Sequence, residues 1–217
     1  AAAPPTARLE LPDGGTLVVA GGTMAERIAQ SGALAALAHA AHPGRSIRVR
    51  EIPWSGDAAG VRPRETGVPG VRDWIIALEA DAVVACFGMT ESFAGPDGLD
   101  GFRRDLEAFV TMVRAARGPA VDVTLVSPLA HEDLGAPWPT GETVAARRRD
   151  LAAHAAVVRD VAASAGTRFV DLFAATDAMA VGGTAPLTTN GIHPGESGAV
   201  LLAGRVAAGL GWLEEEA

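Results

Sequence analysis

Short apolar runs alternate along the chain with segments whose apolar residues recur at intervals of three and four positions. A short apolar run between polar or glycine-rich segments is typical of a buried strand, and the second pattern is typical of an amphipathic helix. Strands are expected at residues 17–20, 47–52, 82–87, 121–126 and 169–173. Helices are expected at residues 24–41, 71–80, 99–117, 144–165 and 197–210. This alternation predicts a five-stranded parallel sheet covered on both faces, an α/β fold of three α/β/α layers.

Ligands of such sheets bind beyond the carboxyl ends of the strands, so the polar residues after each strand are the first candidates for a site. They fall in the segments Gly21–Glu26, Trp54–Asp57, Gly88–Gly95 and Ser127–Asp133, and in the late loop that carries Asn190 and His193. His131, Glu132 and Asp133 are adjacent and their side chains diverge, which favours a solvated loop over a metal site. Arg147-Arg148-Arg149 lies on an expected helix and indicates a solvated face.

The composition narrows the classes of function. A chain of 217 residues suits one domain, residues 1–217, in which residues 1–8 are expected to be a disordered linker or a processed N-terminus. The net charge of −8 argues against nucleic-acid binding, and no apolar run approaches the roughly 20 residues of a membrane span. All 18 basic residues are Arg, so the Lys of a P-loop is missing. The single Cys86 is expected to be a buried structural thiol. No metal or other cofactor is expected.

Four groups of these polar residues occur in a familiar order. Gly21-Gly22-Thr23, Trp54-Ser55-Gly56-Asp57, Gly88-Met89-Thr90-Glu91 and the pair Asn190 and His193 resemble the blocks of the SGNH (GDSL-type) hydrolase superfamily over essentially the whole chain. The resemblance implies a flavodoxin-like SGNH fold and an esterase or deacetylase that acts on an acylated carbohydrate or small ester. The longer phrases, with Arg62-Pro63-Arg64 among them, are similar to a planctomycete-type subgroup. That similarity implies an exported domain, periplasmic or secreted, of a larger multidomain protein.

The resemblance also implies a role for each matching residue. Thr23 takes the place of the nucleophile, His193 that of the general base, and Asn190 that of the group that orients the base. The implied oxyanion hole combines the backbone N–H groups of Thr23 and Gly56 with the side chain of Thr90. The residues expected to contact substrate are Glu26, Ser55, Asp57, Arg62, Arg64 and Glu91.

Three side chains depart from the superfamily pattern, which has Ser, Asn and Asp where this chain has Thr23, Thr90 and Asn190. The extra methyl of Thr23 restricts χ1 and crowds the reacting carbon. Thr90 lacks the amide donor of Asn, and the loss of one oxyanion donor typically costs about 10²–10³ in turnover. Neutral Asn190 cannot stabilise an imidazolium as a carboxylate does, and in serine proteases this exchange costs ~10⁴.

These departures leave alternatives open. A nearby carboxylate, on Glu26, Asp57 or Glu91, would replace the missing acid or act as the base itself. Alternatively, the loops form a binding pocket without turnover, in which Glu91 and the arginines of Arg62-Pro63-Arg64 hold a polar ligand. Thr23 also fits the N-cap of the first helix, with Glu26 completing a capping box.

Overall fold

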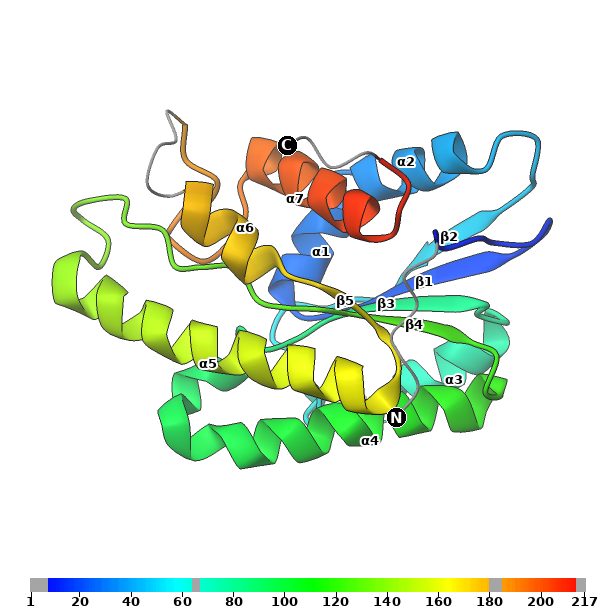
Figure 1. Cartoon of the computed structure of the whole chain (residues 1–217), viewed down its shortest axis with the longest axis horizontal. Coiled ribbons are helices and arrows are strands. Elements are labelled where there is room, and N and C mark those ends of the chain that lie inside the picture. The colour runs from blue at the N-terminus through cyan, green and yellow to red at the C-terminus, as the bar shows by residue number, and fades with distance from the viewer. Residues whose placement is uncertain (1–7, 64–66, 180–184, 214–217) are drawn as a thin grey trace.

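The computed structural model describes residues 8–63, 67–179 and 185–213, and Figure 1 shows a single sheet enclosed between two layers of helices. The sheet has five parallel strands in the order β2-β1-β3-β4-β5. The strands are β1 (Thr16–Gly21), β2 (Arg48–Glu51), β3 (Ala82–Cys86), β4 (Asp122–Val126) and β5 (Arg168–Val170). This is the flavodoxin-like strand order, and it confirms the predicted three-layer sandwich.

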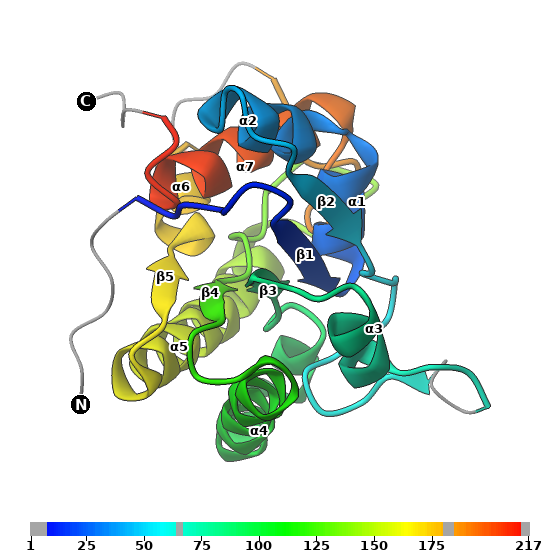
Figure 2. The same ribbon diagram turned by 90° about the vertical axis from the view of Figure 1, so that its right-hand side faces the viewer.

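Helices cover both faces of the sheet. They are α1 (Thr23–Gln30), α2 (Ala33–Ala41), α3 (Val71–Ala77), α4 (Leu99–Arg117), α5 (Gly141–Ala165), α6 (Leu172–Met179) and α7 (Glu196–Gly209). Figure 2 shows α1, α2 and α7 on one face and α3, α4 and α5 on the other. Side chains alternate between the faces along a strand, so Leu17 and Val19 pack under the first layer whereas Val18 and Ala20 pack under the second. The residues that face each layer are apolar, which explains the continuous apolar runs in the sequence.

Several boundaries differ from the sequence prediction for local reasons. The helix expected at 24–41 is two helices, because Gly32 adopts a φ of 69° between α1 and α2. β2 is shorter than expected and mostly exposed, since it is the edge strand. A 3-10 helix, η2 (Glu91–Gly98), and the helix α6 lie outside the prediction, and α6 begins where the fifth strand was expected to continue. The predicted range 99–117 coincides with α4.

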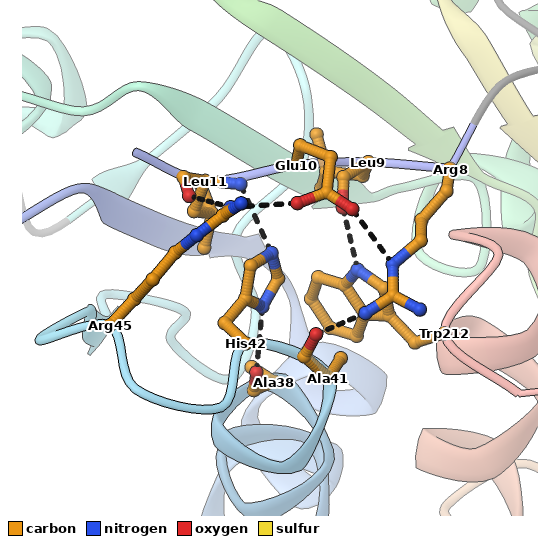
Figure 3. A network of polar contacts seen from close by, with 9 residues as sticks. All are labelled: Arg8, Leu9, Glu10, Leu11, Ala38, Ala41, His42, Arg45 and Trp212. Carbon is orange, nitrogen blue, oxygen red and sulfur yellow. Dashed lines mark hydrogen bonds and ion pairs between the residues drawn. The ribbon is translucent and has the colours of Figure 1, made fainter. Parts of the chain in front are cut away.

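A network of polar contacts ties the residues before β1 to the layer of α2 and α7 (Figure 3). The indole N–H of the buried Trp212 donates to the carbonyl oxygen of Leu9 at 2.9 Å. The N–H of Leu11 donates to Nε2 of His42 at 3.0 Å, and Nδ1 of His42 donates to the carbonyl oxygen of Ala38 at 2.8 Å. Leu9 and Leu11 are buried, so these bonds satisfy backbone groups that would otherwise be desolvated without a partner.

Charged side chains complete this network on its outer side. Glu10 pairs with Arg8 at 3.0 Å and with Arg45 at 2.7 Å, and the hydrogen bond from Arg45 lowers the pKa of the Glu10 carboxyl. Exposed pairs of this kind contribute little to stability. Of the linker expected at residues 1–8, residues 1–7 lie outside the described residues, and Arg8 takes part in these contacts. No helix in the described part of the chain is long and apolar enough to cross a membrane.

The Trp212 contact leads to a prediction about stability. Trp212→Phe removes the indole N–H and leaves the buried carbonyl oxygen of Leu9 without its partner, so we expect a loss of about 1–3 kcal/mol in the free energy of unfolding. For a chain of this size that loss corresponds to a fall in Tm of roughly 2–4 °C per kcal/mol. Thermal unfolding followed by circular dichroism measures it. Trp138→Phe, at an exposed tryptophan, is the matched control, and an equal loss in both variants contradicts the prediction.

Candidate functional site

The loops after β1 and β3 meet where the strand order reverses, between β2-β1 on one side and β3-β4-β5 on the other. Ligands of open α/β sheets bind in the crevice at this point. A pocket of about 60 Å³ lies there. Its lining brings together five of the residues expected from the sequence, namely Thr23, Asp57, Thr90, Glu91 and His193.

Thr23 reaches the pocket from the N-terminus of α1. β1 ends at Gly21, Gly22 is the N-cap, and Thr23 is the first helical residue, with no side-chain capping hydrogen bond at this end. The alternative in which Thr23 is the N-cap of a capping box with Glu26 is therefore wrong, and Thr23 is among the residues that line the pocket. Gly22 is needed for a close approach, because a Cβ there would lie 2.7 Å from the carbonyl oxygen of Asp57. The first N–H groups of a helix lack partners within the helix, so this end offers donors to an oxyanion.

Glu91 holds the loop after β3 against the loop after β2. One carboxylate oxygen accepts the N–H of Gly88 at 2.8 Å, and the other accepts the N–H of Ala59 at 2.8 Å. Both oxygens thus serve backbone groups, so Glu91 shapes the pocket rather than orienting His193. The neighbouring Thr90 hydroxyl lies 3.8 Å from the position that a Cβ of Gly22 would occupy, which places it next to the start of α1.

Asn190 orients His193 through a hydrogen bond of 3.0 Å between the amide nitrogen Nδ2 and the ring nitrogen Nδ1. The amide cannot be turned over, because its oxygen accepts the backbone N–H groups of Ile192 at 3.3 Å and of His193 at 3.0 Å. The amide N–H therefore faces the ring, and Nδ1 must accept the bond. Neutral His193 then carries its proton on Nε2. A catalytic triad needs the opposite tautomer, in which Nε2 accepts the proton of the nucleophile.

His193 is neutral near pH 7. Burial lowers the pKa of His193 from its ordinary value of about 6.5, and the positive charge of Arg27, one turn after Thr23 on α1, lowers it further. The ring therefore takes up a second proton only at a more acidic pH than a free histidine does. The tautomer imposed by Asn190 is thus the state of His193 at neutral pH.

Glu132, in the loop after β4, fastens the loop at residues 187–194. Its carboxylate accepts the N–H of Leu187 at 3.0 Å, the N–H of Thr188 at 2.8 Å and the hydroxyl of Thr188 at 2.6 Å. The N–H of Glu132 in turn donates to the carbonyl oxygen of Gly191 at 2.9 Å. The prediction that Glu132 belongs to a solvated loop is therefore wrong. The position of the histidine loop depends on Glu132, and contacts between residues 55 or more positions apart leave no local pattern in the sequence.

Two further residues near the pocket were expected to be solvated and are not. His131 is buried against Gly191, and burial, followed by the charge of Arg147, lowers the pKa of His131. Arg147 is partly buried and donates to both the carbonyl oxygen and the hydroxyl oxygen of Ser92 at 2.8 Å each. Its guanidinium lies 4.1 Å from the ring centroid of Phe93, which lines the pocket. Arg147 thus holds η2 beside the pocket.

The other expected site residues lie beside the pocket or outside the description. Gly56 has a φ of 89° in an exposed turn and is not among the residues that line the pocket. Glu26 accepts a hydrogen bond from Ser55 and lines a neighbouring hollow. Arg62 donates to carbonyl oxygens of its own loop, and Arg64 lies outside the described residues. The oxyanion role of Gly56 and the substrate-binding roles of the other residues stay predictions.

The buried thiol of Cys86 ends β3 and lines the pocket. Burial raises the pKa of Cys86 to about 12, so the thiol is protonated at neutral pH and is not an activated nucleophile. Within residues 8–63, 67–179 and 185–213, no three His, Cys, Asp or Glu side chains converge on a possible metal position.

Comparisons with known proteins agree with this architecture. A family model described as the GDSL-like lipase/acylhydrolase family matches residues 15–201, and no match is found among curated protein sequences. Among solved structures, an acetylxylan esterase, Axe2 from Geobacillus stearothermophilus, is similar with 19% identity and a TM-score of 0.69 over 96% of this chain and 100% of that chain. An α/β hydrolase enzyme, LAE5 from the metagenome of Lake Arreo, Spain, is similar with 19% identity and a TM-score of 0.68 over 94% and 99% of the two chains. At this identity, the similarity to the two structures establishes the fold.

The charge of Arg27 gives a prediction about His193. Arg27→Gln removes a positive charge that disfavours the imidazolium, so we expect the pKa of His193 to rise toward its ordinary value. Long-range ¹H–¹⁵N spectra recorded against pH measure this pKa and also report which ring nitrogen carries the proton. Arg159→Gln, at an exposed arginine on α5, is the control and should leave the His193 titration unchanged. A His193 pKa that falls in Arg27→Gln, or a wild-type ring protonated on Nδ1 at neutral pH, contradicts the geometry described above.

Proposed function

Since the chain belongs to the GDSL-like lipase/acylhydrolase family, we propose that it is an SGNH-type hydrolase that removes short acyl groups, acetyl above all, from a carbohydrate or another small alcohol. The observation that carries the proposal is the convergence of Thr23 and His193 on one pocket at the strand switch point, with Asn190 bonded to His193. A space of about 60 Å³ suits a short acyl group rather than a long chain. The similarity to an acetylxylan esterase supports an acetylated carbohydrate as the substrate.

In the proposed reaction the hydroxyl of Thr23 attacks the ester carbonyl carbon, and Nε2 of His193 receives the hydroxyl proton. The carbonyl oxygen becomes negative, and the backbone N–H of Thr23 and the hydroxyl of Thr90 stabilise this charge. His193 then gives the proton to the departing alcohol. A water molecule, deprotonated by the same nitrogen, cleaves the acyl-threonine and releases the carboxylic acid.

The contact between Asn190 and His193 limits the rate of this reaction. Before Nε2 can accept a proton, His193 must move its own proton to Nδ1, where it meets the N–H of Asn190 instead of an acceptor. The equivalent mismatch in serine proteases lowers turnover by ~10⁴. We therefore propose a slow hydrolase whose nucleophile and base are in place and whose base is held in the less reactive tautomer.

The same contact supports a second candidate function, ligand binding without turnover. In the tautomer inferred from the Asn190 contact, the His193 Nε2–H, the backbone N–H of Thr23 and the Thr90 hydroxyl are all donors beside one pocket. Arg27 adds a positive charge close to His193. Such a pocket fits a carboxylate or carbonyl group, which is what a retained but inactive hydrolase pocket would hold.

Hydrolysis of short-chain aryl acetates is the first test of the proposed function. We expect the wild type to hydrolyse them slowly and His193→Ala to lower kcat by roughly 10², the lower end of what general-base catalysis contributes, because the wild-type base is already held in the less reactive tautomer. The reaction rate of the wild type should fall only below about pH 6.5, since the lowered pKa of His193 keeps the ring neutral above it. His39→Ala, at an exposed histidine of α2, is the matched control. Wild-type turnover no faster than that of His193→Ala overturns the hydrolase proposal and favours ligand binding.

Asn190→Asp tests the role of the tautomer. A carboxylate accepts hydrogen bonds from both the backbone N–H groups and Nδ1–H of His193. The ring then carries its proton on Nδ1, and Nε2 is free to accept the hydroxyl proton of Thr23. We expect kcat for aryl acetates to rise by up to about 10⁴-fold, and Thr23→Ser to add to this gain by relieving the crowding of the threonine methyl. The double variant Asn190→Asp with His193→Ala is the control and should show no gain. An unchanged kcat in Asn190→Asp, in a wild type that depends on His193, shows that Asn190 does not limit the reaction.

A further inference from the structure

A second hollow opens beside the pocket, between α1, the edge strand β2 and α3, elements that Figure 2 shows near one another. Its volume is about 490 Å³, several times that of the pocket. Two tryptophans line it. Trp54 follows β2 and is 56% exposed, and Trp74 lies on α3 and is 40% exposed. We call this hollow the tryptophan groove.

The exposure of the two indoles points to a ligand. A large aromatic ring left in water forgoes roughly 25 cal/mol per Å² of apolar surface that burial would contribute, and Trp212 shows that this fold can bury an indole, since only 7% of it is exposed. Indoles that line one open groove supply flat apolar surfaces with a polar N–H at the edge. Exposed apolar surface gathered in this way is typical of a binding site.

The rest of the lining decides the kind of ligand. Four of the ten lining residues carry charged or amide groups, namely Glu26, Gln30, Arg50 and Glu51. A long acyl chain would cover these groups without giving them hydrogen-bond partners, which costs affinity. Two carboxylates against one guanidinium disfavour an anionic ligand. A neutral sugar fits both features, because its C–H faces pack on indole rings and its hydroxyl groups both donate and accept hydrogen bonds.

The groove adjoins the pocket through a single turn of the chain. In this turn Trp54 lines the groove and Asp57 lines the pocket, while Ser55 between them donates a hydrogen bond to Glu26. Glu26 lies one turn of α1 after Thr23. A ligand held in the groove therefore ends next to the residues of the pocket.

We propose that the tryptophan groove binds a neutral oligosaccharide, whose acylated hydroxyl then enters the pocket. This assignment rests on the proposed function for the acyl group and names the alcohol that carries it. Trp54 and Trp74 supply the stacking surfaces, and the four polar residues of the lining hold the hydroxyl edges of the sugar rings.

Binding of sugars without acyl groups tests the proposal. The probes are unacetylated xylohexaose, cellohexaose and mannohexaose at millimolar concentration, followed by calorimetry and by the fluorescence of the four tryptophans, with no tyrosine in the chain to interfere. We expect at least one probe to bind, and Trp54→Ala and Trp74→Ala each to weaken it about 10-fold. Trp74→Phe should retain most of the affinity because it keeps a ring. Trp138→Ala is the matched control, since Trp138 is 43% exposed and is not among the groove residues.

The outcomes separate the groove from the hydrolase. Failure of all three probes to bind overturns the proposal, and so does binding that keeps its full affinity in both alanine variants. Thermal unfolding checks that each variant is folded. If an alanine variant does not fold, Trp54→Leu or Trp74→Leu takes its place. The probes carry no ester, so binding without hydrolysis of aryl acetates retains the groove and contradicts the proposed function. Hydrolysis of aryl acetates without binding of any probe supports the proposed function and overturns the assignment of the groove.

Discussion

The side-chain oxygen of Asn190 accepts two backbone N–H groups, and this constraint determines the chemistry available to His193. With the oxygen occupied, the amide nitrogen must face Nδ1 of the ring, and the ring must keep its proton on Nε2. A carboxylate in the same place would accept from the backbone and from the ring at once. The exchange of one carboxylate oxygen for a nitrogen therefore reverses the direction of the hydrogen bond to the His193 ring, while the ring keeps its place beside the pocket.

Two carboxylates give the pocket its shape without taking part in its chemistry. Glu91 accepts the N–H groups of Gly88 and Ala59 and so joins the loops after β3 and β2. Glu132 accepts three donors of the loop at 187–194 and so places the histidine loop beside α1. Hydrogen bonds from several donors to one ionised group are stronger than those between neutral groups. Both oxygens of Glu91 accept backbone N–H groups, so Glu91 is not placed to replace the missing triad acid. Asp57 lines the pocket, and Glu26 accepts a hydrogen bond from Ser55 beside it.

The sequence predicts the layers and the strand positions well, because both faces of the sheet are apolar and the helices keep their spacing, as α4 shows over its whole length. It misses the break between α1 and α2, which lies at Gly32, where φ is 69°. Thr23, Thr90 and His193 are predicted by the order of their motifs after the strands. The roles of Glu132 and Arg147 are not predictable in this way, because their partners are backbone groups and a serine about 55 positions away, and such contacts exist only once the loops are packed.

The pocket and the tryptophan groove differ in size, and we propose that each holds a different part of the substrate. Thr23 and His193 line the smaller hollow, of about 60 Å³, which we propose holds the reacting acyl group. The groove of about 490 Å³ lies on the other side of the turn from Trp54 to Asp57. Binding energy gained by the remote part of a substrate can be used to hold the reacting bond in place. If the groove binds the alcohol as proposed, its positioning of the substrate adds to the rate enhancement of a site whose base is in the less reactive tautomer, and small aryl esters that do not reach the groove gain none of it.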